Sequence, residues 1–162
     1  SLDSVHGGSG EFTIEGNICA AIGNCAWNDL AIERLASTPE LLCAVTFLLE
    51  SNSDWAAGHA ARTLGNLAFS VECTKIISNM TSLRSTILQV IGDLITPLYT
   101  QRTQERAVHA IANLSGEDSM CLSLHHVPDL YTCLNEIRVM GFAGDGKASD
   151  ESEESLRRAL AR

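Results

Sequence analysis

Aromatic residues and prolines are scarce in this chain. Phe, Trp and Tyr make up only 5% of the residues and there are three prolines, although the hydrophobic share reaches 45%. A β-sandwich would use more aromatic and β-branched residues. The composition therefore favours helices that pack through Leu, Ile, Val and Ala. With 162 residues, the chain is long enough to bury a substantial core as one domain.

An excess of positive charge and long apolar runs are also lacking. The formal net charge is −9, whereas a protein that binds duplex nucleic acid needs clustered Lys and Arg. No run reaches the roughly 18 apolar residues of a membrane-spanning helix, and no signal peptide is recognisable. We therefore expect neither a nucleic-acid nor a membrane partner.

Motifs for catalysis and metal binding are missing as well. The six cysteines include no Cys-x-x-Cys pair and lie in apolar or helical surroundings, so we expect reduced thiols and a cytoplasmic location, with the nucleus or a cytoskeletal assembly as alternatives. Cys121 and His125 share a helical face, but zinc needs three or four ligands and no second pair lies nearby. No nucleophile elbow, phosphate loop or paired-carboxylate pattern occurs. We expect no catalytic residue, no metal and no cofactor, and hence no enzyme.

One short pattern occurs three times in the chain. Each copy reads small, aliphatic, small, asparagine, apolar, small, and the copies are residues 21–26 (AIGNCA), 63–68 (TLGNLA) and 110–115 (AIANLS). The asparagines Asn24, Asn66 and Asn113 lie 42 and 47 residues apart, which is within the period of helical repeats. A fourth copy at residues 159–162 has arginine in the asparagine position.

Apolar spacing and capping residues divide the chain into units of a short helix, a buried helix and a longer helix rich in small residues. The expected helices span residues 12–27, 29–35, 39–50, 55–70, 71–79, 82–98, 101–115, 117–126, 128–140 and 155–162. The first of these is only the last helix of a unit, and the last one stops in mid-pattern. The first and last repeats are therefore expected to be incomplete.

Two segments differ in composition from the helical part. Residues 1–11 contain a Gly-Gly-Ser-Gly run and are expected to be flexible. They are either a linker preceded by a tag remnant or tethered peptide, or a native disordered end. Residues 141–155 are rich in glycine and then acidic, so a mobile loop is expected there. The repeat domain is expected to span residues 12–162, with this loop inside it.

The block small-x-x-small-Leu-x-Asn-Leu, on the third helix of a three-helix unit, resembles armadillo repeats, the modules of β-catenin and importin-α. The resemblance covers roughly residues 12–162 and implies an all-α solenoid of about three to four repeats. HEAT repeats, which have two helices, are the nearest alternative, and the short first helices favour armadillo. In the armadillo family the third helices line a concave groove, where the conserved asparagine binds the backbone of an extended peptide. The matching residues are Asn24, Asn66 and Asn113; alternatively, these asparagines only brace or cap neighbouring helices.

Residues one to three helical turns before each asparagine share its stripe and are expected to set specificity. Importin-α carries tryptophan four residues before its asparagine, and this chain does not, so nuclear import is not favoured. Most of the stripe is cationic, with one tryptophan as the best-placed apolar anchor. Its members are Trp55, His59, Arg62, Arg102, Arg106, His109 and Arg158. A cationic groove on an acidic protein predicts an acidic ligand; the alternative is that these are ordinary solvated helix faces.

The sequence therefore predicts a protein–protein interaction module that holds an extended, acidic peptide segment of a partner in its concave groove. The alternative function is structural. Because solenoid ends expose apolar repeat faces, such a chain can also assemble or self-associate through its ends.

Overall fold

The computed structural model describes residues 13–142 and 149–161. In this part of the chain the structure is entirely helical, which confirms the all-α prediction. The helices are α1 (Ile14–Cys25), α2 (Asp29–Ala36), α3 (Pro39–Leu49), α4 (Asp54–Leu67), α5 (Val71–Asn79), α6 (Thr81–Asp93), α7 (Gln101–Leu114), α8 (Asp118–Leu124), α9 (Leu130–Met140) and α10 (Asp150–Leu160).

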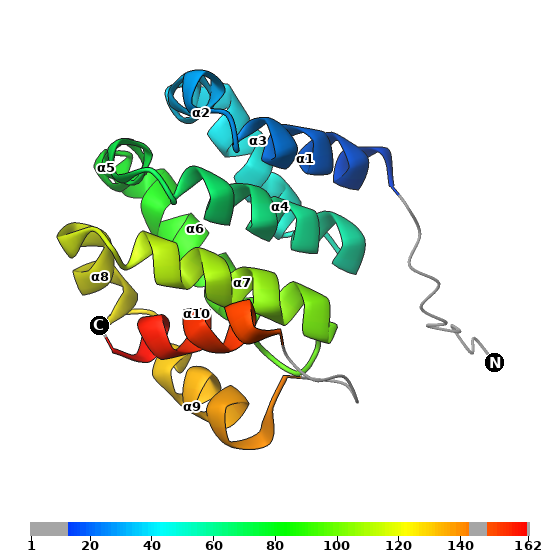
Figure 1. Ribbon diagram of the computed structural model, residues 1–162, viewed down its shortest axis with the longest axis vertical. Helices are drawn as coiled ribbons and strands as arrows, with labels where there is room; N and C mark the ends of the chain where they lie inside the picture. The colour runs from blue at the N-terminus through cyan, green and yellow to red at the C-terminus, as the bar shows by residue number, and fades with distance from the viewer. Residues whose placement is uncertain (1–12, 143–148, 162) are drawn as a thin grey trace.

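The helices are arranged as a solenoid of three-helix repeats (Figure 1). Helices α1, α4, α7 and α10 lie side by side, with α4 packed against α1 and α7, and α10 packed against α7. Helices α3 and α6 lie behind this row, α9 packs against α10 at the lower end of the row in the view of Figure 1, and the short helices α2, α5 and α8 follow one another along one edge. The row of third helices is thus made of the segments that carry the repeated block.

Local sequence signals explain where most helices begin. Thr13, Ser53 and Ser70 each accept a hydrogen bond from a backbone N–H in the first turn of α1, α4 and α5. Pro39 occupies the first turn of α3, where its missing N–H costs nothing. These caps are the residue types that favour helix starts, and α5 spans the residues that the sequence predicts.

Helix α6 ends earlier than expected, at Asp93 instead of residue 98. Leu94 and Ile95, which follow it, are buried in the core. The Thr96 hydroxyl donates a hydrogen bond to the Asp93 carbonyl, and Pro97 has no N–H to continue the helix. A compact turn therefore replaces the last helical turn.

The largest correction concerns the acidic segment expected to be a mobile loop. Helix α10 begins at Asp150, so the second half of that expected loop is helical, and the last repeat contains all three helices. Ser149 caps the helix, since its Oγ accepts a hydrogen bond from the Ser152 N–H at 3.1 Å, and acidic residues in the first turn interact favourably with the helix dipole. Residues 143–148 of the expected loop, and the expected flexible end at residues 1–11, lie outside the described residues.

Small residues let the third helices approach one another closely. A Cβ on Gly58 of α4 would lie 2.5 Å from Thr103 Oγ1 of α7, and a Cβ on Gly23 of α1 would lie 2.8 Å from Thr63 Oγ1 of α4. Neither position has room for a side chain. Because the helix axes come so close, polar side chains of one third helix reach the backbone of the preceding one.

Candidate functional site

The repeated asparagines connect adjacent third helices. Asn66 Nδ2 donates a hydrogen bond to the Gly23 carbonyl of α1 at 2.8 Å, and Asn113 Nδ2 donates to the Gly65 carbonyl of α4 at 2.9 Å. Both asparagines are buried, with 7% and 8% of their surface exposed. Their amide donors therefore act inside the solenoid, which supports the alternative interpretation that these residues brace neighbouring helices.

The two carbonyl groups that accept these bonds lie in the last turns of α1 and α4, where the backbone of the described residues supplies no N–H donor to them. At the end of α1 the Trp27 N–H bonds the Asn24 carbonyl, and at the end of α4 the Phe69 N–H bonds the Asn66 carbonyl. The carbonyls of Gly23 and Gly65 consequently receive no backbone N–H from the described residues. A helix leaves such carbonyls open in its last turn, so each asparagine caps the third helix of the preceding repeat.

Asn24, the first asparagine of the series, is exposed. Its Oδ1 accepts a hydrogen bond from Arg62 Nη2 at 2.8 Å, and the same nitrogen lies 3.0 Å from the Ala20 carbonyl. In the described part of the chain, Asn66 Oδ1 accepts no hydrogen bond. The Oδ1 of Asn66 and the second hydrogen of its Nδ2 are therefore the groups through which Asn66 can contact a peptide, since the bond to Gly23 uses one amide hydrogen.

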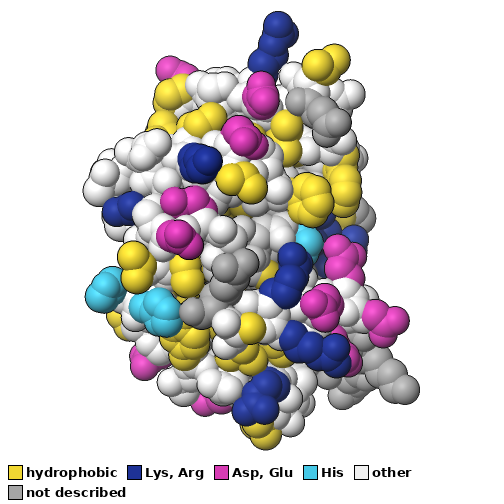
Figure 2. All heavy atoms as spheres, turned by 60° about the vertical axis from the view of Figure 1, so that its left-hand side comes forward, with side chains coloured by type: hydrophobic (Ala, Val, Ile, Leu, Met, Phe, Trp, Pro, Cys, Tyr) yellow, Lys and Arg dark blue, Asp and Glu magenta, His cyan; other side chains and the backbone are white. Residues whose placement is uncertain are grey.

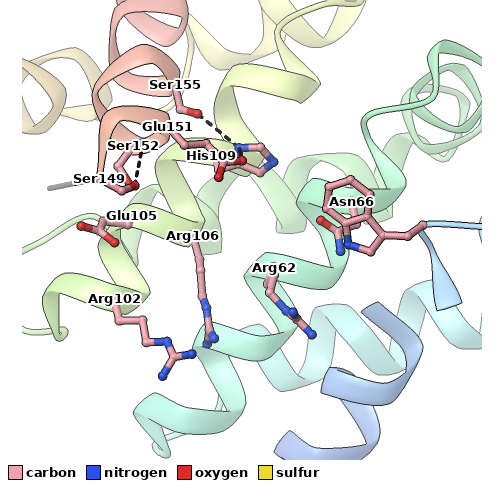
Figure 3. A pocket seen from close by; sticks show the side chains of 11 residues that line it. Arg62, Asn66, Arg102, Glu105, Arg106, His109, Ser149, Glu151, Ser152 and Ser155 are labelled. Carbon is pink, nitrogen blue, oxygen red and sulfur yellow. Dashed lines mark hydrogen bonds and ion pairs between the residues drawn. The ribbon is translucent and has the colours of Figure 1, made fainter. Parts of the chain in front are cut away.

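Three arginines, which we call the arginine cluster, converge between α4 and α7. They are Arg62 of α4 and Arg102 and Arg106 of α7, and Figure 3 shows their guanidinium groups directed to the same side. None of them forms an ion pair within residues 13–142 and 149–161. Burial and the neighbouring guanidinium groups lower the pKa of Arg106 to about 10, and burial together with Arg102 lowers the pKa of Arg62. Asp54 and Glu105 partly oppose this lowering of the Arg106 pKa, so the cluster carries positive charge that nearby carboxylates offset only in part and without a direct ion pair among the described residues.

His59 and Trp55 lie beside the cluster. His59 is only 5% exposed, and neither of its ring nitrogens has a hydrogen-bond partner among the described residues. Burial and then the charges of the arginine cluster lower its pKa to about 4, so the ring is neutral at pH 7. The Trp55 ring packs against His59 at 4.3 Å between centroids, and Arg102 lies over it at 5.9 Å. Trp55 is half-buried, so it is already packed rather than projecting as an isolated anchor.

The arginine cluster opens into a hollow with a volume of about 310 Å³ between α4, α7 and α10. Five predicted site residues line this hollow, namely Arg62, Asn66, Arg102, Arg106 and His109. Its remaining lining residues are Trp27, Glu105, Ser149, Glu151, Ser152 and Ser155. The structure thus brings half of the predicted site residues into one concave surface.

The first turns of α10 border this hollow (Figure 3). His109 Nδ1 lies 3.2 Å from Ser155 Oγ and 3.9 Å from a carboxylate oxygen of Glu151. Burial lowers the pKa of His109, the Glu151 carboxylate opposes that effect, and Arg158 adds to it. The hollow therefore has a cationic wall from α4 and α7 and an acidic edge from α10.

The remaining predicted residues lie elsewhere. Arg158 donates to Asn113 Oδ1 at 3.4 Å and to Ser155 Oγ at 3.3 Å. Arg158 and Asn113 line a separate hollow next to the exposed Phe69 and Val71. The predicted stripe is thus divided between two hollows: the first contains the arginine cluster, and the second contains Asn113 and Arg158 next to exposed apolar side chains.

Sequence reasoning missed several residues of the main hollow. Trp27 is 70% exposed and comes from the turn after α1, and the signal that could have found it is a tryptophan at the end of a third helix. Ser149, Glu151 and Ser152 lie in the segment expected to be a mobile loop, residues 141–155. The pattern Ser149-x-x-Ser152 in front of an amphipathic helix is a capping signal that would have placed them on α10.

Two further features of the described residues limit the chemistry. No group of three or more His, Cys, Asp or Glu side chains in residues 13–142 and 149–161 is placed to hold a metal ion. None of the helices described has the length and apolar character required to cross a lipid bilayer.

Comparison with known proteins identifies the fold. A solved structure of a designed armadillo repeat protein, YIII(Dq)4CqI, matches with a TM-score of 0.74 and 19% sequence identity. The match covers 93% of this chain and 59% of the designed protein, so the chain spans less than two thirds of its length. No protein-family model and no curated protein sequence matches the chain.

The chain therefore has an armadillo-like repeat fold. The likeness shows the fold alone at 19% identity, so the ligand has to be inferred from the site.

Proposed function

We propose that this protein is an interaction module that binds an extended, acidic peptide segment of a partner along the row of third helices. The observation that carries the proposal is the arginine cluster, since three guanidinium groups face one hollow without an ion pair among the described residues. Mutual repulsion of unpaired charges costs free energy that an anionic ligand would recover. No catalytic role is proposed.

The shape of the site favours an extended ligand. The lining residues come from α4, α7 and α10 and from the end of α1, so a ligand in the hollow runs across successive third helices. The free Oδ1 of Asn66 lies on this path and can accept a backbone N–H. A chain that crosses the helices in this way would meet the exposed Trp27 ring at one side.

The charge of the ligand follows from the contrast between the site and the whole protein. The net charge of −9 repels acidic molecules at long range, whereas the arginine cluster attracts them at short range. Screening at physiological salt limits the repulsion to about 8 Å. Each charge-assisted hydrogen bond to a partly buried guanidinium is worth about 1.5–3 kcal/mol, so a few acidic side chains suffice for recognition.

A random peptide library displayed on phage tests this proposal. Selection on the wild-type protein should enrich peptides rich in Asp and Glu, and their binding should weaken at least tenfold in Arg62→Glu and Arg106→Glu. Arg34→Glu is the matched control, because Arg34 is an exposed arginine on α2, and it should leave binding unchanged. Enrichment without acidic residues, or binding that survives both reversals, would refute the proposal.

Self-association through the solenoid end remains the second candidate. Ile14 and Ile18 of α1 and Phe47 of α3 are 76%, 52% and 73% exposed on the first helices of the stack. On the face seen in Figure 2, hydrophobic side chains lie in separate groups between polar and charged ones. Light scattering over a concentration series tests the candidate: an Ile18→Lys variant should be monomeric at concentrations where the wild type is dimeric or larger.

A further inference from the structure

The positive charge of the arginine cluster exceeds what a single carboxylate can neutralise. Arg62, Arg102 and Arg106 supply three guanidinium groups to one hollow. We propose that the cluster binds a phosphorylated side chain of the peptide, so that the partner is recognised in its phosphorylated form. This inference rests on the proposed function, because it identifies the anionic group that the peptide presents.

The donors of the cluster match a phosphoryl group. A phosphoryl group on serine, threonine or tyrosine carries a charge of about −1.5 to −2 at pH 7 and three strong acceptor oxygens. Arginine binds such oxygens in pairs through its planar fork. Neither Arg106 nor Arg102 donates a hydrogen bond to a described residue, and the Arg102 guanidinium lies over the ring of Trp55. Both forks are therefore available to a ligand.

The two helices hold these donors at different angles. Arg102 and Arg106 are one helical turn apart on α7, and Arg62 approaches from α4, where the Asn24 and Ala20 oxygens hold its Nη2. The Nε of Arg62 is buried without a hydrogen-bond partner among the described residues. A tetrahedral anion between the helices can accept bonds from both sides, which a planar carboxylate does less completely.

His59 packs beside the cluster, although it is not among the residues that line the hollow. It is nine-tenths buried beside the cluster, and both of its ring nitrogens lack partners among the described residues. A buried polar group without a partner costs about 1–3 kcal/mol. The buried ring therefore adds to the cost of keeping the neighbouring guanidinium charges together, but its covered nitrogens are not counted among the donors to the ligand.

The surroundings of the cluster favour one phosphoryl group over a continuous polyanion. Glu105 and Glu151 line the same hollow, so a nucleic-acid strand that placed one phosphate on the arginines would bring others against these carboxylates. Arg157 cannot extend the cluster, since it pairs with Glu153 and Glu154 at 3.7 Å. An isolated phosphoryl group on an otherwise flexible peptide avoids this repulsion.

Fluorescence anisotropy with three matched peptides tests the inference. The labelled peptides share an alanine-rich sequence and carry phosphoserine, serine or glutamate at the centre. The phosphoserine peptide should bind at least tenfold more tightly than the glutamate peptide, and the serine peptide should bind most weakly. Arg102→Gln and Arg106→Gln should abolish the preference for phosphoserine, whereas Arg34→Gln should preserve it. Since Arg102 is exposed, its variant keeps the test valid even if another substitution prevents folding.

The possible results separate this inference from the proposed function. Equal binding of the glutamate and phosphoserine peptides would overturn the phosphoryl inference and leave the acidic-peptide proposal standing. Competition by inorganic phosphate that matches the peptide on a molar basis would overturn it as well, because the peptide would then contribute nothing. If neither the acidic phage peptides nor the phosphoserine peptide binds, both proposals are wrong.

Discussion

The asparagine that caps the preceding repeat allows a sharp test of how this solenoid is held together. Asn66→Ala removes the donor that bonds the Gly23 carbonyl at 2.8 Å. That carbonyl receives no backbone N–H from the described residues, so it would stay buried without a partner. The expected loss in the free energy of unfolding is about 1–3 kcal/mol. For a domain of this size, that corresponds to a fall in Tm of roughly 2–12 °C.

Two variants make the measurement specific. Asn24→Ala changes the same residue type at the equivalent position of the preceding repeat, but Asn24 is exposed, and among the described residues its side chain bonds Arg62 alone. Its effect should stay within about 0.5 kcal/mol. Asn66→Asp keeps the size of the side chain but places a carboxylate oxygen against the Gly23 carbonyl, so it should destabilise more than Asn66→Ala.

Urea unfolding followed by circular dichroism compares the three variants with the wild type. The midpoint should order them as wild type and Asn24→Ala, then Asn66→Ala, then Asn66→Asp. If Asn66→Ala unfolds at the same urea concentration as Asn24→Ala, the amide of Asn66 does not cap α1 and the account of repeat coupling is wrong.

Three further predictions concern helix spacing, charge and the start of α10. Gly58→Ala should lower the free energy of unfolding by about 1–3 kcal/mol, because a Cβ there would lie 2.5 Å from Thr103 Oγ1. In an open helix the same change stabilises by up to about 1 kcal/mol, and such a gain here would contradict the close contact between α4 and α7. The pKa of His59 is lowered from 6.5 to about 4, so the unfolded chain binds the extra proton and stability should fall as the pH drops from 6.5 towards 4. The His59 contribution reaches at most about 3 kcal/mol and should vanish in His59→Gln, and parallel pH profiles of the two proteins would exclude it. Ser149→Ala removes the cap of α10 and should lower the free energy of unfolding by about 1 kcal/mol. Relative to the wild type, amide hydrogen exchange should become faster in α10 and stay the same in α4. Unchanged exchange in α10 would refute the capping role.

The repeat architecture could be predicted because the sequence encodes it locally. The block around Asn24, Asn66 and Asn113 recurs at the period of a three-helix unit, and its small residues allow the close helix contacts at Gly23 and Gly65. N-cap residues such as Ser70 set the start of a helix, here α5, through hydrogen bonds to residues only a few positions away. These features depend on neighbours within a few residues, which a sequence displays directly.

The partners of the site residues could not be predicted in the same way. The helical stripe predicts Arg62, Arg102 and Arg106 on one surface, and all three line the same hollow. The direction of the Asn66 amide depends on where the end of α1 lies, and the acidic edge depends on where α10 folds back. Acidic composition suggested a mobile segment at Glu151, whereas the Ser149 cap and the buried Ser152 and Ser155 make it helical.

The asparagine-to-carbonyl bonds also bear on how this protein unfolds. Each bond runs from a third helix to the one before it, from α4 to α1 and from α7 to α4. In a linear array, cooperativity depends on such nearest-neighbour terms. Opening of α4 would break both bonds at once, so the central repeat couples its neighbours, and partial unfolding is expected to begin at either end of the row.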